Sequence, residues 1–426
     1  MSFNRREFLE TTLGGLAAVG AGGVLGLDPL VGSDSAAYAG FPTPDASAGF
    51  RPDTLFLTWQ RDPTTTMTIQ WLGHEHKQKT PISYAVLGKD EWQTAEAPKQ
   101  KPFPTTQFEV FRTELTGLSP GTEYQFKIGD KSPTFRFRTM PAKATNDFTF
   151  VSGGDAGVNQ HTIDNNIVAA RQDPMFCLMG GDIAYDNGVS AATNIQYHRD
   201  YSRTMIDTQG RLIPMVVCIG NHEVRTSKAP LHDKAPFYFA WHDGLFADNS
   251  FNTLDFGDYL SLVLLDTNHA MPAGGEQTSW LEKTLAERVD IPNLIAVNHV
   301  PAYPSVRDFK FGGGAPNRKF WVPLFEKYNV DLVLEHHDHA FKRTFPMKDG
   351  LKDPNGILYL GDGSWGKIRK LNGPEKTPYL ETANESYHFS IHRLEGAERF
   401  HMAMNDSGRI IDVCSTKKKP RGKSMG

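Results

Sequence analysis

Hydrophobic and polar positions alternate in short runs between residues 54 and 139. In the last of these runs, Phe135 and Phe137 alternate with Arg136 and Arg138, which predicts a strand with one buried and one solvent-facing side. Runs of this kind predict strands over residues 54–58, 66–71, 82–86, 108–115, 124–128 and 134–139. We therefore expect a small all-β module over residues 51–140.

Beyond residue 147 the pattern changes to apolar strand-like runs that alternate with helical spacing. Strands are predicted at residues 148–151, 175–179, 213–219, 294–297 and 331–334, with helices at 162–172, 278–288 and 322–328. A hairpin is expected within 251–265, and a final group of strands within 357–410. This order predicts an α/β sandwich over residues 147–414, in which ligand-binding side chains gather at the carboxyl ends of strands.

The two ends of the chain differ from the segments between them. Residues 1–39 contain Asn4-Arg5-Arg6-Glu7-Phe8-Leu9, which resembles the twin-arginine export consensus, then a Gly/Ala-rich apolar stretch and Ala37-Tyr38-Ala39 as a cleavage site. An uncleaved membrane anchor is the alternative, but the apolar stretch is short for a spanning helix. We expect a signal read by the twin-arginine machinery, a periplasmic or secreted protein, and no stable membrane anchor after cleavage. Residues 415–426 are expected to form a basic, solvated tail.

Length, charge and cysteine content narrow the range of functions. A chain of 426 residues is long enough for two domains. Its formal charge of −4 provides no electrostatic basis for nucleic-acid binding. Three cysteines cannot form a disulfide framework, and Cys177 and Cys218 lie inside apolar runs where a small buried side chain is expected.

Polar side chains that bind hard and borderline metals follow several of the predicted strands. They offer carboxylate, phenol, amide and imidazole groups and no thiolate, a set that suits oxygen-loving di- and trivalent cations. If the loop after residue 179 begins a helical turn, Asp182 and Tyr185 share one face. The pattern suggests a two-metal hydrolytic site. The donor residues are Asp155, Asp182, Tyr185, Asn221, His299 and the run Glu335-His336-His337-Asp338-His339.

Each of these residues alone has an ordinary structural explanation. His299 could be a hydrogen-bonded loop histidine, Asp182 a helix cap, Tyr185 a core tyrosine and Asn221 a turn residue. Their joint occurrence in one order, each at a strand end, favours the metal site.

Two segments of the chain resemble known families. Leu118-Ser119-Pro120-Gly121-Thr122-Glu123-Tyr124 is similar to the turn and tyrosine of fibronectin type III sandwiches. The ordered metal donors resemble the purple acid phosphatase branch of the calcineurin-like metallophosphoesterases, over residues 51 to about 395. Gln277-x-x-Trp280-Leu281 and Gly361-Asp362-Gly363 are subsidiary features. Most of that superfamily carries Asp-x-His and Asp-x-x-Asp, whereas Gly157 and Tyr185 occupy the two final positions here.

The resemblance implies a ligand assignment and a reaction. Asp155, Tyr185 and His339 would hold Fe(III), Asp182 would bridge, and a divalent metal (Zn, Mn or Fe) would be held by Asn221, His299 and His337. A hydroxide on the iron would attack the phosphorus of a small-molecule phosphoester. His222 would be the catalytic residue that hydrogen-bonds the phosphoryl oxygen or protonates the leaving group.

The chain departs from the family pattern at two places. Glycine usually precedes the paired histidines, but His336 stands there, so a register in which His336 replaces His337 as a ligand stays open. Many plant relatives carry a histidine pair after the equivalent of His299, where this chain has Pro301-Ala302-Tyr303-Pro304. Candidate substrate contacts are Tyr303, Arg225 and His161.

The sequence thus predicts an exported dinuclear enzyme that hydrolyses phosphate monoesters. A phosphodiesterase or nucleotide hydrolase on the same centre is one alternative. A non-catalytic surface module is the other.

Overall fold

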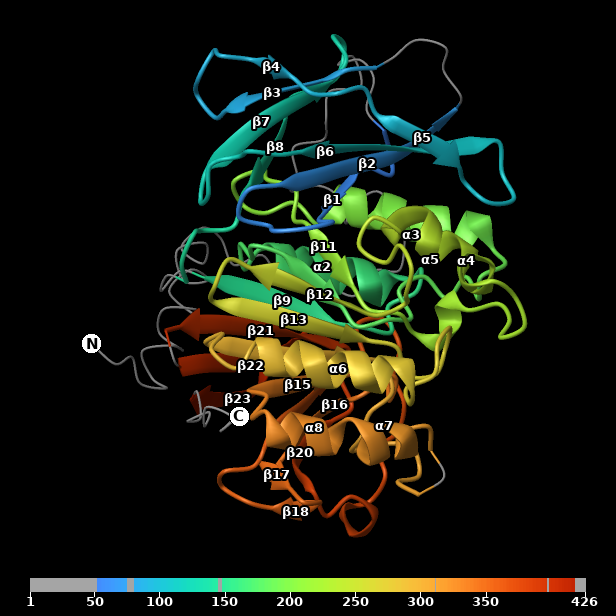
Figure 1. Cartoon of the computed structure of the whole chain (residues 1–426), viewed down its shortest axis with the longest axis vertical. Coiled ribbons are helices and arrows are strands. Elements are labelled where there is room, and N and C mark those ends of the chain that lie inside the picture. Colours follow the sequence, from blue (N-terminus) through green and yellow to red (C-terminus); the bar gives the residue numbers. More distant parts are fainter. Residues whose placement is uncertain (1–51, 75–79, 145–147, 311, 397, 418–426) are drawn as a thin grey trace, which may run out of the picture.

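The computed structural model describes residues 52–74, 80–144, 148–310, 312–396 and 398–417, and it consists of a β sandwich stacked on an α/β sandwich (Figure 1). The predicted signal peptide and residues 418–426 of the predicted tail lie outside the described residues. None of the helices in the described ranges combines the length and apolar composition needed to cross a bilayer.

The N-terminal module pairs two four-stranded sheets, and every strand pairing in them is antiparallel. One sheet has the order β1 (Phe56–Thr58), β2 (Met67–His74), β6 (Phe108–Leu115), β5 (Lys99–Pro102). The other has the order β4 (Gln93–Thr94), β3 (Ile82–Val86), β7 (Glu123–Ile128), β8 (Phe135–Arg138). The hydroxyl of Tyr124 accepts a hydrogen bond of 2.9 Å from the amide of Ser119, which closes the predicted turn. The predicted sandwich is confirmed.

Two of the four edge strands of this module, β4 and β5, were not predicted from the sequence pattern. β4 and β5 are short and carry mostly exposed polar side chains, so they lack the apolar alternation that marks the predicted strands. In β8, by contrast, the two phenylalanines are buried and Arg136 is exposed, as the alternation predicted.

The second domain contains two large sheets. The first has six strands in the order β11 (Met215–Val217), β10 (Cys177–Met179), β9 (Thr149–Gly153), β21 (His388–Glu395), β22 (Glu398–Asn405), β23 (Ile410–Lys417). The second has seven strands in the order β12 (Asn252–Phe256), β13 (Leu260–Leu265), β14 (Asn293–Asn298), β15 (Leu332–Glu335), β19 (Tyr359–Asp362), β16 (Phe341–Thr344), β20 (Leu380–Asn384). A hairpin of β17 (Met347–Lys348) and β18 (Leu351–Lys352) extends beyond it.

Alternate side chains of the seven-stranded sheet enter two different hydrophobic clusters. Leu262 and Leu264 belong to the large cluster shared with the six-stranded sheet, whereas Val263 and Leu265 pack beneath helices. Those helices are α6 (Glu276–Glu287) and α8 (Val322–Lys327), preceded by the short α7 (Ala315–Phe320). The predicted α/β sandwich is therefore confirmed.

Helices on the other side complete the layers. α2 (Gln160–Ala170) packs on β21 and on α3 (Ala191–Thr204), and α3 in turn contacts β1 of the N-terminal module. The sequence pattern missed α3 because its buried face includes polar residues such as Asn194, His198 and Asp200. The short elements are η1 (Asn221–Glu223), α4 (Leu231–Lys234), α5 (Pro236–His242) and η2 (Pro374–Lys376).

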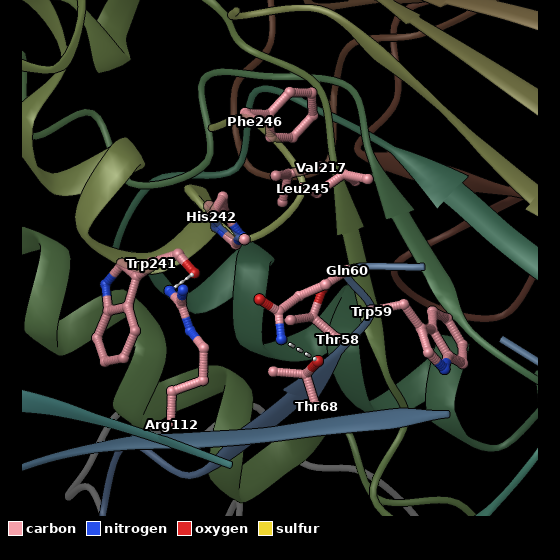
Figure 2. Close-up of a pocket in the computed structure, with 11 residues that line it drawn as sticks. Thr58, Trp59, Gln60, Thr68, Arg112, Val217, Trp241, His242, Leu245 and Phe246 are labelled. Carbon is pink, nitrogen blue, oxygen red and sulfur yellow. Dashed lines mark hydrogen bonds between the residues drawn. The ribbon is translucent and has the colours of Figure 1, made fainter. Parts of the chain in front are cut away.

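The two domains share a packed junction. Trp59 of the sandwich lies edge-on against Phe176 and Phe256, with ring centroids 6.1 and 5.9 Å away. Figure 2 shows Arg112 reaching from β6 to the backbone of Trp241, to whose carbonyl it donates a hydrogen bond of 2.7 Å. The cavity that these side chains border is about 10 Å³, room for about one water molecule.

The C-terminal strand is longer than the sequence predicted. β23 continues to Lys417, where Ser415, Thr416 and Lys417 pair with Phe400, Arg399 and Glu398. Residues 415–417 thus belong to the sheet and not to a solvated tail. The Lys417 ammonium forms an ion pair of 2.5 Å with Glu398, so its charge did not indicate a loop.

Candidate metal centre

The predicted donors come from strand ends of both large sheets. β9, β10 and β11 run parallel to one another, as do β13, β14, β15 and β19, so their carboxyl ends meet at one edge of the sandwich. The loops after β9 and β10 stay paired beyond the strands, because the amides of Asp155 and Gly157 donate to the carbonyls of Gly181 and Ile183 at 3.1 and 2.8 Å.

Five of the donor residues adopt a left-handed backbone conformation. Such a conformation costs about 1–3 kcal/mol in a residue other than glycine and persists only where the surrounding structure enforces it. Their φ angles are 58° for Asp155, 53° for Asp182, 60° for Tyr185, 69° for His337 and 57° for His339. This concentration of strain indicates that the loops are shaped by the site.

Asp155, Tyr185 and His339 form one half of the centre. The Tyr185 hydroxyl lies 3.2 Å from Oδ1 of Asp155 and 2.9 Å from Nε2 of His339, and that nitrogen lies 3.0 Å from the same carboxylate oxygen. Burial raises the pKa of the Tyr185 phenol far above its usual range, and the carboxylates of Asp155 and Asp182 raise it further. A phenolate at this position therefore requires a strongly positive partner.

His299, His337 and Asp182 form the other half. Nδ1 of His299 lies 2.9 Å from the carbonyl oxygen of Gly180, which can only accept, so in the neutral ring Nε2 carries the lone pair. That Nε2 lies 3.0 Å from Nδ1 of His337 and 3.2 Å from Oδ2 of Asp182. A carboxylate oxygen and two imidazole nitrogens thus converge on one point.

With His299 neutral, two buried oxygen atoms of the site accept no hydrogen bond from the described part of the chain. They are Oδ2 of Asp182 and Oδ1 of Asn221. Such an atom is costly to bury unless a cation or a donor satisfies it. Asp155, Asp182, His299 and His337 also place one ligand atom each within 4.8 Å of one another. The residues present therefore fit a bound metal.

A proton competes with a metal for His299. Burial alone would lower the pKa of this imidazole, but the nearby carboxylates of Asp182 and Asp155 outweigh burial and raise its pKa to about 9. The same negative field attracts a metal cation.

Family models match both domains. The model for the N-terminal domain of purple acid phosphatases matches residues 52–139, and the calcineurin-like phosphoesterase model matches residues 140–341. Together they span more than half of the chain. It belongs to the purple acid phosphatase family, a group of phosphoric ester hydrolases within the calcineurin-like phosphoesterases.

The individual relatives of the chain are distant. Purple acid phosphatase 21 of Arabidopsis thaliana is 26% identical over 303 residues, which cover 68% of this chain and 67% of the relative. An uncharacterised protein of Mycobacterium tuberculosis is 26% identical over 389 residues, covering 82% of this chain and 72% of that protein. The purple acid phosphatase of yellow lupin seeds has a similar fold, with a TM-score of 0.69 at 17% identity over 85% of this chain and 73% of the lupin chain.

His222 lies beside the donors. Its amide donates a hydrogen bond of 2.7 Å to Oδ1 of Asp182, and its Nε2 is 3.9 Å from the other oxygen of that carboxylate. Its Nδ1 is hydrogen-bonded to the side-chain oxygen of Asn187, and its ring lies 4.2 Å from that of Tyr185. The imidazole is half-buried, which lowers its pKa. It is therefore accessible at the edge of the centre.

The positions of the rings show which histidines of the run 336–339 face the other donors. Nδ1 of His336 is 3.1 Å from the carbonyl oxygen of Asn298, and its buried ring fills the space next to Gly180, where an added Cβ would lie 1.9 Å from it. His337 and His339 are the two that face the other donors.

Glu223 holds two donor loops together and was missed as a site residue. Its carboxylate accepts hydrogen bonds from the amides of Gly220, Asp182 and Ile183 at 2.7, 2.8 and 2.9 Å. Burial and the carboxylates of Asp182 and Asp186 raise its pKa to about 8. Its adjacency to Asn221 and His222 was the only signal in the sequence, and adjacency does not reveal that it reaches back to another strand.

The structure does not bring the three predicted substrate contacts together. Tyr303 is 2% exposed and packs against Tyr359 and Tyr379, so a substrate cannot reach it; that prediction is wrong, because the ring belongs to the core beneath the helices.

The other two candidates are engaged elsewhere. His161 on α2 forms an ion pair of 2.8 Å with Asp406 and stacks on Tyr387. Arg225 is exposed, and its Nε donates to the carbonyl of Asp233 at 2.7 Å. Neither contact involves a metal donor, and their role in substrate binding stays a prediction.

Proposed function

We propose that this protein is an exported phosphatase that hydrolyses phosphate monoesters at a dinuclear centre of Fe(III) and a divalent metal (Zn, Mn or Fe). The observation that carries the proposal is the convergence of buried lone pairs from His299, His337 and Asp182 beside the phenol of Tyr185. Such a cluster is stable only around positive charge.

The assignment of donors to the two metals follows their grouping. Asp155, Tyr185 and His339, which lie within 3.2 Å of one another, would hold the trivalent iron, since a phenolate is a hard anionic ligand. The divalent metal would be held by Asn221, His299 and His337, with Asp182 shared between the two. When bound, the metals would lower the pKa of a coordinated water and neutralise charge on the phosphoryl oxygens.

His222 would act on the substrate directly. Its Nδ1 is engaged by Asn187, which leaves Nε2 on the side of the Asp182 carboxylate, 3.9 Å away. From this position the imidazole, when protonated, can hydrogen-bond a phosphoryl oxygen or give a proton to the leaving alkoxide.

The protein would be exported before it acts on its substrate. The twin-arginine motif at Arg5-Arg6 supports delivery by that machinery to the periplasm or beyond, with residues 1–39 removed. A small-molecule phosphoester would be the partner, and no nucleic acid is expected, in keeping with the formal charge of −4.

One preparation tests the proposal. Metal analysis should find iron and a second metal in equal amounts, and a panel of aryl phosphates should show faster turnover of the monoester than of the bis-aryl diester. Preferred turnover of the diester would instead identify a phosphodiesterase. Failure of the metal-loaded protein to hydrolyse any phosphoester would favour a non-catalytic role.

A further inference from the structure

A loop outside the predicted donor set lies against the metal centre. It covers residues 363–373, between β19 and η2, and we call it the 363–373 loop. The amide of Gly366 donates to the carbonyl of Asp155 at 3.0 Å, and the amide of Arg369 donates to the carbonyl of His339 at 2.8 Å. Lys367 is therefore held between two of the donor loops.

The ammonium group of Lys367 is placed over Tyr185. Its Nζ lies 4.5 Å from the centre of the Tyr185 ring, on a side chain that is only partly exposed. Among the described residues it has neither a hydrogen-bond acceptor nor a carboxylate partner. Arg307 differs, because its guanidinium already donates to the carbonyl of His337 and to Asp338. Lys367 is thus a cation beside the centre with its hydrogen-bonding capacity free.

Gly157 leaves room for this side chain. A Cβ on Gly157 would lie 3.0 Å from Cε of Lys367 and 3.3 Å from Cδ2 of Tyr185, so these neighbours would have to shift by a few tenths of an ångström. The φ of +73° at Gly157 disfavours any other residue as well. The stem of Lys367 therefore passes close to Gly157, where a larger residue would crowd it.

We propose that Lys367 binds the phosphoryl group of the substrate and favours the dianion of a monoester over the monoanion of a diester. This inference rests on the proposed function. An ammonium beside the metal donors can bond a phosphoryl oxygen that the metals leave free, and a dianion retains more negative charge for it to bind. Lys367 would then contribute to the preference for monoesters, in addition to the metals.

Three lysine variants distinguish phosphate binding by the Lys367 ammonium from a general effect of losing one positive charge. Lys367→Met keeps the apolar stem over Tyr185 and removes the ammonium, whereas Lys370→Met removes the same charge from an exposed position of the same loop. Lys367→Arg retains the charge and should restore most of the binding.

The first measurement is calorimetric binding of inorganic phosphate to the metal-loaded protein. Lys367→Met should weaken phosphate binding by about tenfold or more, the size expected for one charge-assisted hydrogen bond, and Lys370→Met should bind like the unaltered protein. Equal phosphate affinity in Lys367→Met and Lys370→Met would overturn the inference. So would a loss of metal or of the visible absorption in Lys367→Met with phosphate affinity unchanged, because the lysine would then only support Tyr185.

The second measurement is kinetic. Lys367→Met should raise KM for an aryl phosphate monoester more than it lowers kcat, and should change KM for the diester less. If the unaltered protein hydrolyses phosphoesters but Lys367→Met leaves KM unchanged, the role of Lys367 fails and the proposed function stands. If no phosphoester is hydrolysed yet phosphate binding still depends on Lys367, the proposed function fails and the phosphate site stands.

Discussion

At the scale of single residues, hydrogen bonds fix one atom of His299, Asp182 and Asp155 and leave the opposite atom pointing at the centre. Nδ1 of His299 donates to a backbone carbonyl, so Nε2 faces inward. Oδ1 of Asp182 accepts from the amide of His222, and Oδ2 of Asp155 accepts from the amide of His337, both at 2.7 Å. Such supporting bonds orient metal ligands before the metal arrives.

Tyr185 provides a test of the iron assignment at this scale. The iron-loaded protein should be coloured by charge transfer from the phenolate, and Tyr185→Phe should abolish the visible absorption band while leaving the fold intact. Tyr387→Phe, which alters a tyrosine stacked on His161, is the control and should stay coloured. An unaltered protein that is active but colourless would contradict the iron assignment.

His299 makes metal binding dependent on pH. Because its pKa is raised to about 9, most of the metal-free protein carries a proton there at neutral pH, and a metal must displace it. Metal affinity should therefore rise by up to about tenfold per pH unit and level off above pH 9. In the metal-free protein, the stability that this proton contributes is present below the ordinary histidine pKa and is lost as pH rises through about 9. Competition with a chelator from pH 6 to pH 10 measures the affinity, and a constant affinity over that range would contradict the prediction.

At the scale of elements, β6 and α5 join the two domains. Arg112 on β6 donates to Asp243 at 2.6 Å and to the carbonyl of Trp241 at 2.7 Å, and Lys101 on β5 reaches the same carboxylate. Only 12% of the Arg112 side chain is exposed. Water therefore cannot readily take its place as the hydrogen-bond donor to these groups.

Removal of this contact should destabilise the protein. Arg112→Met should lower the free energy of unfolding by about 2–3 kcal/mol, because it removes the charged donor of Asp243 and of the backbone carbonyls of Ala240 and Trp241. Arg61→Met on the same sandwich removes an ion pair with Glu114 in which the arginine is 66% exposed, and should cost less than about 1 kcal/mol. Denaturant unfolding of both variants checks this. Equal effects would show that the junction does not depend on Arg112.

At the scale of the whole molecule, the centre connects the two large sheets. Asp155, Asp182 and Asn221 follow strands of the six-stranded sheet, whereas His299 and His337 follow strands of the seven-stranded sheet. Metals bound between them would cross-link layers that are otherwise held by apolar packing and by hydrogen bonds such as those from His299 to Gly180 and from His337 to Asp155.

Metal removal should therefore lower global stability. At a metal concentration a thousandfold above Kd, binding stabilises the folded state by about 4 kcal/mol, so chelation should lower Tm and readdition should restore it. Asp182→Asn keeps the acceptor for His222 but removes the shared charge, and should lose both metals and this response. Asp258→Asn, at the exposed turn between β12 and β13, is the control. A Tm that is the same with and without metal would contradict the proposed cross-link.

The local sequence pattern was sufficient to predict the fold class and the types of side chain that lie at the strand ends. Periodicity reports which face of a strand or helix is buried, as the alternation at Phe135 and Phe137 did, and strand ends with Asp, Asn and His can be read without knowing their neighbours. Parallel strands then place those ends at one edge by geometry alone.

Tertiary packing decided what each individual side chain does. His336 and His337 are adjacent and chemically identical, yet one fills a gap beside Gly180 and the other faces His299. Tyr303 became part of the core, and Lys367 reached the centre from a loop nearly two hundred residues away from Tyr185 in the sequence. These outcomes depend on how loops from separate strands fill shared space, which no local stretch of sequence encodes.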